Sequence, residues 1–79
     1  MVVQVHYFGV LQDQAGCASE RFTTQADTTY ELLKELQNKG RIVVSEKILR
    51  VALNDEFCNW SKPLSDGDNV AFMPPMAGG

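Results

Sequence analysis

Few residues of this chain have side chains or positions suited to chemistry, and the two glycines at its end, Gly78 and Gly79, stand out. Glycine has no Cβ atom, so a glycine pair can enter a channel too narrow for side chains and present a main-chain carboxylate inside another protein. A carboxylate is a poor electrophile and must be activated, typically by attack on the α-phosphate of ATP. A sulfur or amine nucleophile can then displace AMP. The ending predicts a carboxylate that partner enzymes use.

The residues before these glycines also differ from the rest of the chain. The ending reads Pro74-Pro75-Met76-Ala77-Gly78-Gly79. Consecutive prolines favour an extended path, so Pro74 and Pro75 should hold the ending away from the folded body. We expect a folded domain over residues 1–73 and a flexible tail over residues 74–79. A frayed chain end without function would show the same composition, and this interpretation stays open.

A standalone enzyme would have few candidate side chains. His6 is the only histidine and is expected on the less buried face of its strand. Cys17 and Cys58 have no CxxC spacing and no histidine pair nearby in sequence, so we expect partly buried thiols rather than a metal site, a disulfide or a nucleophile activated by His6. Asp66 and Asp68 lie in a predicted turn, which favours Asx hydrogen bonds over acid–base work. Neither GxGxxG nor GxxxxGK[ST] occurs, so no bound nucleotide or other cofactor is expected.

Composition argues against two classes of partner. Hydrophobic residues make up 44% of the chain and charged residues 22%, as in ordinary globular domains, and 79 residues suffice for one core. The net charge is −3 without a cluster of Lys or Arg, which disfavours nucleic acid. No run approaches the ~20 apolar residues of a membrane span, and the start does not resemble a signal peptide. We expect a cytoplasmic protein.

The positions of apolar residues predict the elements that hold the tail. Strands are expected over residues 3–7, 19–24, 49–53 and 69–73, with a short return strand around Phe57 and a helical turn over residues 10–15. The segment 42–47 is ambiguous. The first and last strands are rich in β-branched or aromatic residues, so we expect them side by side at the centre of the sheet.

One main helix is predicted after Thr28, which forms a capping-box pattern with Glu31, and it should end at Gly40. Its apolar stripe is Tyr30, Leu32, Leu33 and Leu36. A mixed sheet of four to five strands crossed by one main helix is an α+β roll.

The last 17 residues, from Pro63 to Gly79, closely resemble the ending of molybdopterin synthase small subunits. Residues 5–8, Gly16 and the helix start at 30–32 agree more weakly. The resemblance implies a β-grasp, ubiquitin-like fold. It also implies that the Gly79 carboxylate is adenylated by a ubiquitin-activating-like enzyme that uses ATP, and is then converted to a thiocarboxylate with sulfur from a persulfide.

The same resemblance implies how the tail is used. The tail, Pro74, Pro75, Met76, Ala77, Gly78 and Gly79, would enter the active site of a large synthase subunit that holds the catalytic side chains. Two sulfur transfers would then build the dithiolene of molybdopterin, in a heterotetramer of small and large subunits. Phe72 and Met73 are expected to contact partners.

Two positions depart from the family pattern, and several related functions remain open. Gln12 replaces a residue that is often basic, and Met73 one that is often aromatic or branched. Carriers for thiamin, cysteine or tRNA thiolation share the fold, although the thiamin carrier usually lacks the Pro74-Pro75 pair. A ubiquitin-like modifier of lysines and a standalone enzyme are alternatives from other classes.

Overall fold

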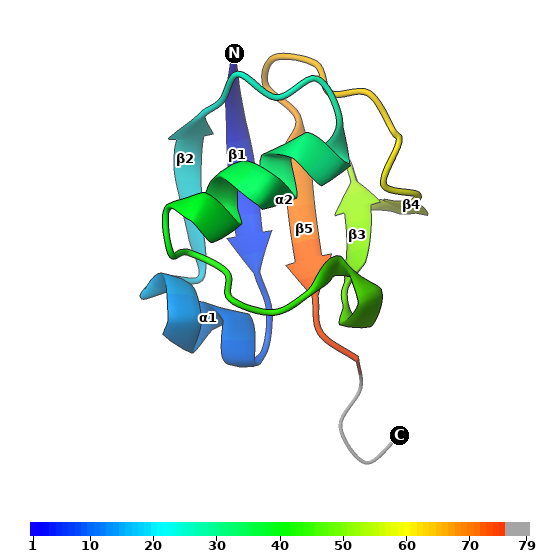
Figure 1. Ribbon diagram of the computed structural model, residues 1–79. Coiled ribbons are helices and arrows are strands. Elements are labelled where there is room, and N and C mark those ends of the chain that lie inside the picture. Colours follow the sequence, from blue (N-terminus) through cyan, green and yellow to red (C-terminus); the bar gives the residue numbers. More distant parts are fainter. Residues whose placement is uncertain (76–79) are drawn as a thin grey trace.

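The computed structural model describes residues 1–75, and these form a five-stranded mixed sheet crossed by one main helix (Figure 1). In chain order the elements are β1 (Val2–Tyr7), α1 (Val10–Ala15), β2 (Ser19–Thr23), α2 (Thr29–Asn38), the 3-10 helix η1 (Glu46–Ile48), β3 (Arg50–Leu53), β4 (Glu56–Cys58) and β5 (Asn69–Met73). Helix α2 lies across β1 and β5, and α1 lies near the end of the sheet where β5 finishes (Figure 1). No helix within residues 1–75 is long and apolar enough to cross a bilayer.

The order of the strands determines where the tail leaves the domain. The sheet runs β2-β1-β5-β3-β4, with β1 and β5 parallel and the other neighbours antiparallel. Val5 is paired with Val70 and Tyr7 with Phe72, so the prediction that the first and last strands are central neighbours is confirmed. The chain therefore passes from the central strand directly into Pro74.

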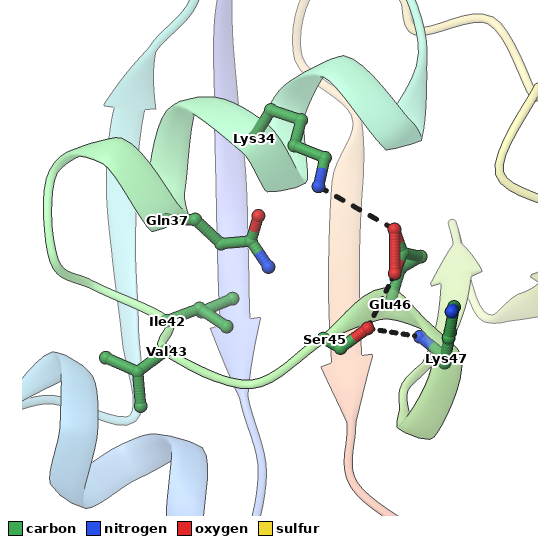
Figure 2. Close-up of a pocket in the computed structure, with 7 residues that line it drawn as sticks. All are labelled: Lys34, Gln37, Ile42, Val43, Ser45, Glu46 and Lys47. Atoms are coloured by element: carbon green, nitrogen blue, oxygen red, sulfur yellow. Dashed lines mark hydrogen bonds and ion pairs between the residues drawn. The ribbon is translucent and has the colours of Figure 1, made fainter.

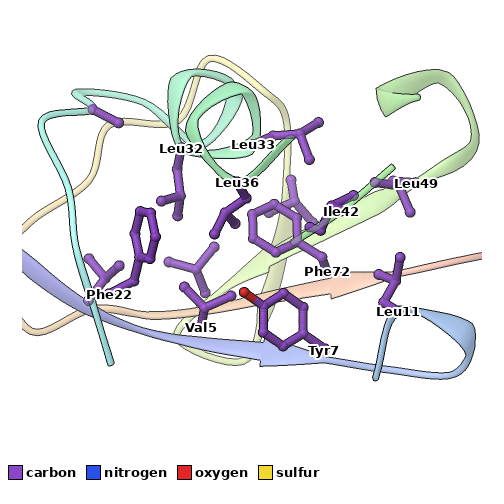
Figure 3. Packing of buried hydrophobic residues seen from close by; sticks show 14 of the residues in the cluster. Val5, Tyr7, Leu11, Phe22, Leu32, Leu33, Leu36, Ile42, Leu49 and Phe72 are labelled. Atoms are coloured by element: carbon purple, nitrogen blue, oxygen red, sulfur yellow. The ribbon is translucent and has the colours of Figure 1, made fainter. Parts of the chain in front are cut away.

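The core forms between α2 and the inner face of the sheet (Figure 3). Val3, Val5 and Tyr7 are buried while the residues between them in β1 are partly exposed, as the alternation predicts. Phe72 is fully buried and stacks on Trp60, with ring centroids 6.1 Å apart. Burial of such a side chain stabilises the fold by about 1.5–3 kcal/mol, so β5 is held firmly up to the residue before Met73.

Helix α2 begins where the capping pattern predicts, but its buried stripe differs. The Thr28 hydroxyl accepts a hydrogen bond from the Glu31 amide at 3.3 Å, and the Glu31 carboxylate accepts one from the Asp27 amide at 2.7 Å. The expectation that Tyr30 belongs to the apolar stripe is wrong, because its side chain is 39% exposed. Thr29 is buried instead.

The segment that the sequence left ambiguous packs as an irregular loop followed by η1. Ile42 is fully buried, and the Gln37 side-chain amide donates a hydrogen bond to the Val44 carbonyl oxygen at 2.8 Å. After η1, the chain enters β3 and returns through the turn at Asn54 and Asp55, which both have positive φ (50° and 73°). Positive φ at both central residues is typical of a tight two-residue hairpin turn, and Asn and Asp tolerate it.

Candidate functional site

Four of the predicted site residues, Met76, Ala77, Gly78 and Gly79, lie outside the described residues, so their roles stay predictions. The structure does describe the point from which they depart. Pro74 is half-buried and Pro75 is exposed, directly after the end of β5. The described part of the site is therefore the base of the tail.

Gly9 lies beside the tail at this base. It is the residue before α1, with φ 57° and ψ −135°, a conformation that residues with a side chain adopt at a cost. A Cβ atom added to Gly9 would lie 3.1 Å from Cγ of Pro74, whereas one added to Gly16, also at positive φ, would meet nothing within 4 Å. Two independent reasons therefore favour glycine at position 9, and one of them is the position of Pro74.

An apolar groove of about 760 Å³ lies beside the tail base. We call its lining the tail-base surface: Phe8, Gly9, Val10, Arg50, Phe57, Met73, Pro74 and Pro75. The side chains of Phe8, Val10 and Phe57 are 47%, 52% and 57% exposed. Large apolar side chains gathered on an exposed surface usually mark a site of protein contact.

Arg50 is the one charged residue that lines this groove. Pairing of the last three strands places it opposite Met73, and its guanidinium carbon lies 3.9 Å from the centroid of the Phe57 ring. The ion pairs among residues 1–75 are Lys34–Glu46 and Arg41–Glu20, so Arg50 has no carboxylate partner in that range. The tail-base surface thus combines apolar contact area with a single cation.

The two expected partner-contact residues of β5 have different environments. Met73 is half-buried and lines the groove. Phe72 points into the core with 0% exposure, so the expectation that it contacts a partner is wrong. Alternation along β5 explains the difference, because successive side chains point to opposite faces of the sheet.

Both acidic residues of the turn before β5 accept backbone hydrogen bonds, and the bond to Asp68 lies within the turn, as predicted. The Asp66 carboxylate accepts a hydrogen bond from the Val2 amide at 2.7 Å, and the Asp68 carboxylate accepts one from the Ser65 amide at the same distance. The Asp66 bond joins the turn to β1, and the Asp68 bond closes the turn. They occupy both carboxylates in positioning the start of β5.

The histidine and the cysteines do not form a common site. His6 Nε2 lies 3.0 Å from Oδ1 of Asn69, on the neighbouring strand. Cys17 and Cys58 are half-buried free thiols, and burial raises the pKa of the Cys58 thiol, which disfavours a nucleophilic thiolate. No group of three or more potential metal ligands occurs within the part of the chain that the structure describes.

A second hollow, of about 660 Å³, lies between α2 and the loop that leads into η1 (Figure 2). Two of its charged groups are paired: the Lys34 ammonium lies 3.6 Å from the Glu46 carboxylate, which also accepts a hydrogen bond from the Ser45 hydroxyl at 2.7 Å. The Ser45 hydrogen bond lowers the pKa of Glu46. We interpret this hollow as a surface irregularity that these contacts stabilise.

Sequence reasoning missed Phe8, Gly9, Val10, Arg50 and Phe57 as parts of the site. One signal was present: Arg50 alternates with the buried Leu49 and Val51, which predicts that its side chain points away from the core. The proximity of these five residues to the tail depends on strand pairing, which the spacing of apolar residues does not reveal.

Comparison with known proteins adds evidence from sequence and from structure. The model of the ThiS family matches residues 5–79. The chain is 25% identical over 81 residues to the molybdopterin synthase sulfur carrier subunit of Escherichia coli (strain K12), with 99% of this chain and 100% of that protein covered.

Two solved structures show the same architecture. A chain in the complex of subunits 1 and 2 of molybdopterin-converting factor from Helicobacter pylori 26695 is 34% identical, with both chains fully covered and a TM-score of 0.69. SAMP1 from Haloferax volcanii is 22% identical, again with full coverage of both chains, and gives a TM-score of 0.82. The latter likeness bears on the fold alone, and it confirms the predicted β-grasp.

Proposed function

The chain belongs to the ThiS family of ubiquitin-like sulfur carriers, and we propose that it carries sulfur for the synthesis of molybdopterin. A carboxylate oxygen of Gly79 attacks the α-phosphorus of ATP on a ubiquitin-activating-like enzyme, and pyrophosphate leaves. A persulfide sulfur then attacks the acyl carbon, and AMP leaves. A thiol reduces the resulting S–S bond, which leaves a thiocarboxylate on Gly79.

The observation that carries this choice among sulfur carriers is the likeness to the molybdopterin-converting factor complex, at 34% identity over the full length of both chains. The 25% identity to a molybdopterin synthase sulfur carrier subunit supports the same choice. In this proposal the tail, residues 74–79, enters the active site of the large synthase subunit. That subunit supplies the catalytic side chains, and two such transfers complete the dithiolene within a heterotetramer.

The tail-base surface is the docking site in this proposal. A partner that receives the tail must contact the domain around the point of departure, and there Phe8, Val10 and Phe57 offer exposed apolar area. Pro74 and Pro75 restrict the direction in which the tail leaves, which lowers the entropy cost of its insertion. Met73 adds an adaptable apolar contact, suited to a surface that two different enzymes bind in turn.

Reconstitution with purified proteins tests this function. The chain is combined with the adenylating enzyme and the large synthase subunit of the same organism, ATP, a persulfide donor with a thiol reductant, and the cyclic pterin precursor. We expect molybdopterin to form, and to require Gly79 and ATP.

The matched control is the chain without Gly79, which should fold but give no product, because a terminal glycine buries little apolar surface. If the thiocarboxylated chain produced no molybdopterin yet supplied sulfur to a thiamin, cysteine or tRNA acceptor, the assignment to molybdopterin would be wrong and the carrier class would stand. Conjugates between Gly79 and lysines would instead point to a protein modifier.

A further inference from the structure

We propose that Arg50 determines which partners the tail-base surface accepts, by binding a carboxylate on the docked enzyme. This inference rests on the proposed function, because it concerns the proteins that receive the tail. It adds a specific chemistry to the partner: an apolar contact area that carries an Asp or Glu side chain opposite Arg50.

The Phe57 ring holds the Arg50 guanidinium in a defined orientation. The guanidinium carbon lies 3.9 Å from the ring centroid, a distance at which the planar cation interacts with the face of the ring. A guanidinium donates its hydrogen bonds from its edges, in its own plane. Within residues 1–75 the guanidinium forms no ion pair, so its N–H donors are available to a bidentate acceptor such as a carboxylate.

The surroundings of Arg50 favour an ion pair with a docked enzyme. It is exposed, and within residues 1–75 it forms no ion pair. Its neighbours in the groove, including Val10, Met73 and Pro74, are apolar. When an enzyme covers this groove and removes water, an unpaired guanidinium becomes costly, and a facing carboxylate compensates that cost.

The acceptor is a protein carboxylate rather than a phosphate of ATP. The six tail residues that follow Met73 can extend over roughly 20 Å, so an inserted tail places the reacting carboxylate far from Arg50. The chain as a whole has a net charge of −3, opposite in sign to Arg50. Long-range attraction of an acidic partner is therefore weak, and the contact acts on orientation and on the choice of partner.

Binding measurements on Arg50 variants test the inference. The wild-type chain, Arg50→Gln and Arg50→Glu are titrated into the adenylating enzyme and, separately, into the large synthase subunit, at low and at high salt. We expect Arg50→Gln to raise Kd about 10-fold for at least one enzyme at low salt, and Arg50→Glu to raise it further through repulsion. The matched control is Arg21→Gln, an exposed arginine of β2 outside the tail-base surface, which should leave Kd unchanged.

The salt dependence separates a charge contact from lost packing. The ratio of the Arg50→Gln Kd to the wild-type Kd should fall as salt rises, because salt weakens a charge contact, whereas a packing defect would leave that ratio unchanged. If Arg50→Gln bound both enzymes as tightly as the wild type, with the same salt dependence, the inference would be overturned and the proposed function would stand. If the wild-type chain bound neither enzyme and received no sulfur, the proposed function would fail together with the inference.

Discussion

At the scale of single residues, the contact between Gly9 and Pro74 links the folded domain to the direction of its tail. Gly9 has a positive φ, and a Cβ atom added to it would lie 3.1 Å from Cγ of Pro74, so a methyl group fits only if the Pro74 ring moves. Pro74 is the first residue after β5, so any displacement of its ring changes the path of the residues that follow. The absence of a side chain at position 9 therefore bears on function as well as on the stability of the junction between β1 and α1.

Gly9→Ala tests this link, with Gly16→Ala as its matched control. Gly16→Ala places a side chain in the left-handed helical region and should destabilise the domain by about 1–2 kcal/mol. Gly9→Ala, at φ 57° and ψ −135°, should destabilise it at least as much, so both variants are compared where both are folded. Only Gly9→Ala also pushes against Pro74. We expect thiocarboxylate formation by the adenylating enzyme to slow several-fold for Gly9→Ala and to remain near the wild-type rate for Gly16→Ala, in single-turnover assays at a temperature where both are folded. Equal rates for the two variants would show that the Pro74 contact does not position the tail.

At the scale of elements, a chain of polar contacts joins β1, β2, α1 and the segment that follows α2. The Tyr7 hydroxyl of β1 donates a hydrogen bond to the Glu20 carboxylate of β2 at 2.6 Å. Arg41, which follows α2, forms an ion pair with Glu20 at 3.3 Å and donates to the Ala15 carbonyl oxygen of α1. Burial and the neighbouring Glu20 raise the pKa of Tyr7 well above its ordinary value, so the hydroxyl remains a donor.

This raised pKa predicts a loss of stability at high pH. The unfolded chain releases the Tyr7 proton near the ordinary pKa of 10.0, whereas the folded chain retains it. The contribution of Tyr7 to the free energy of unfolding is therefore fully present below pH 10 and declines above it. We expect Tyr7→Phe to lower the free energy of unfolding by about 1 kcal/mol at neutral pH, through loss of the hydrogen bond. Above pH 10, the free energy of unfolding of this variant should decline less steeply than that of the wild type. Urea unfolding followed by circular dichroism measures both effects. A Tyr7→Phe curve parallel to that of the wild type would contradict this account.

Patterns in the sequence identify the elements better than they identify the surface. The alternation in β1 and the cap at Thr28 depend on local chemistry, and both are confirmed. The assignment of Tyr30 to the buried stripe failed because Thr29 is buried at the start of α2, where its hydroxyl donates to the Asn59 carbonyl oxygen at 3.0 Å. That partner lies 30 residues away in sequence, so local spacing does not reveal it.

At the scale of the whole molecule, the proposed function depends on the residues that strand pairing brings to one end of the sheet. The central position of β5 places Pro74 and Pro75 directly after the middle of the sheet, and the pairing of β3 with β4 and β5 places Arg50 and Phe57 beside them. The glycine pair and the two prolines were recognisable from sequence because they are contiguous. The tail-base surface was not, since its residues come from four separate segments.

The central claim is that Gly79 carries sulfur as a thiocarboxylate, and mass spectrometry of the intact protein isolated from cells tests it most directly. We predict a fraction of the chain that is heavier by the difference between one sulfur and one oxygen atom. The shift should map to the peptide that ends at Gly79, and it should be absent from cells that lack the adenylating enzyme. If that peptide carried only the ordinary carboxylate in cells that are actively making molybdopterin, the claim would be contradicted.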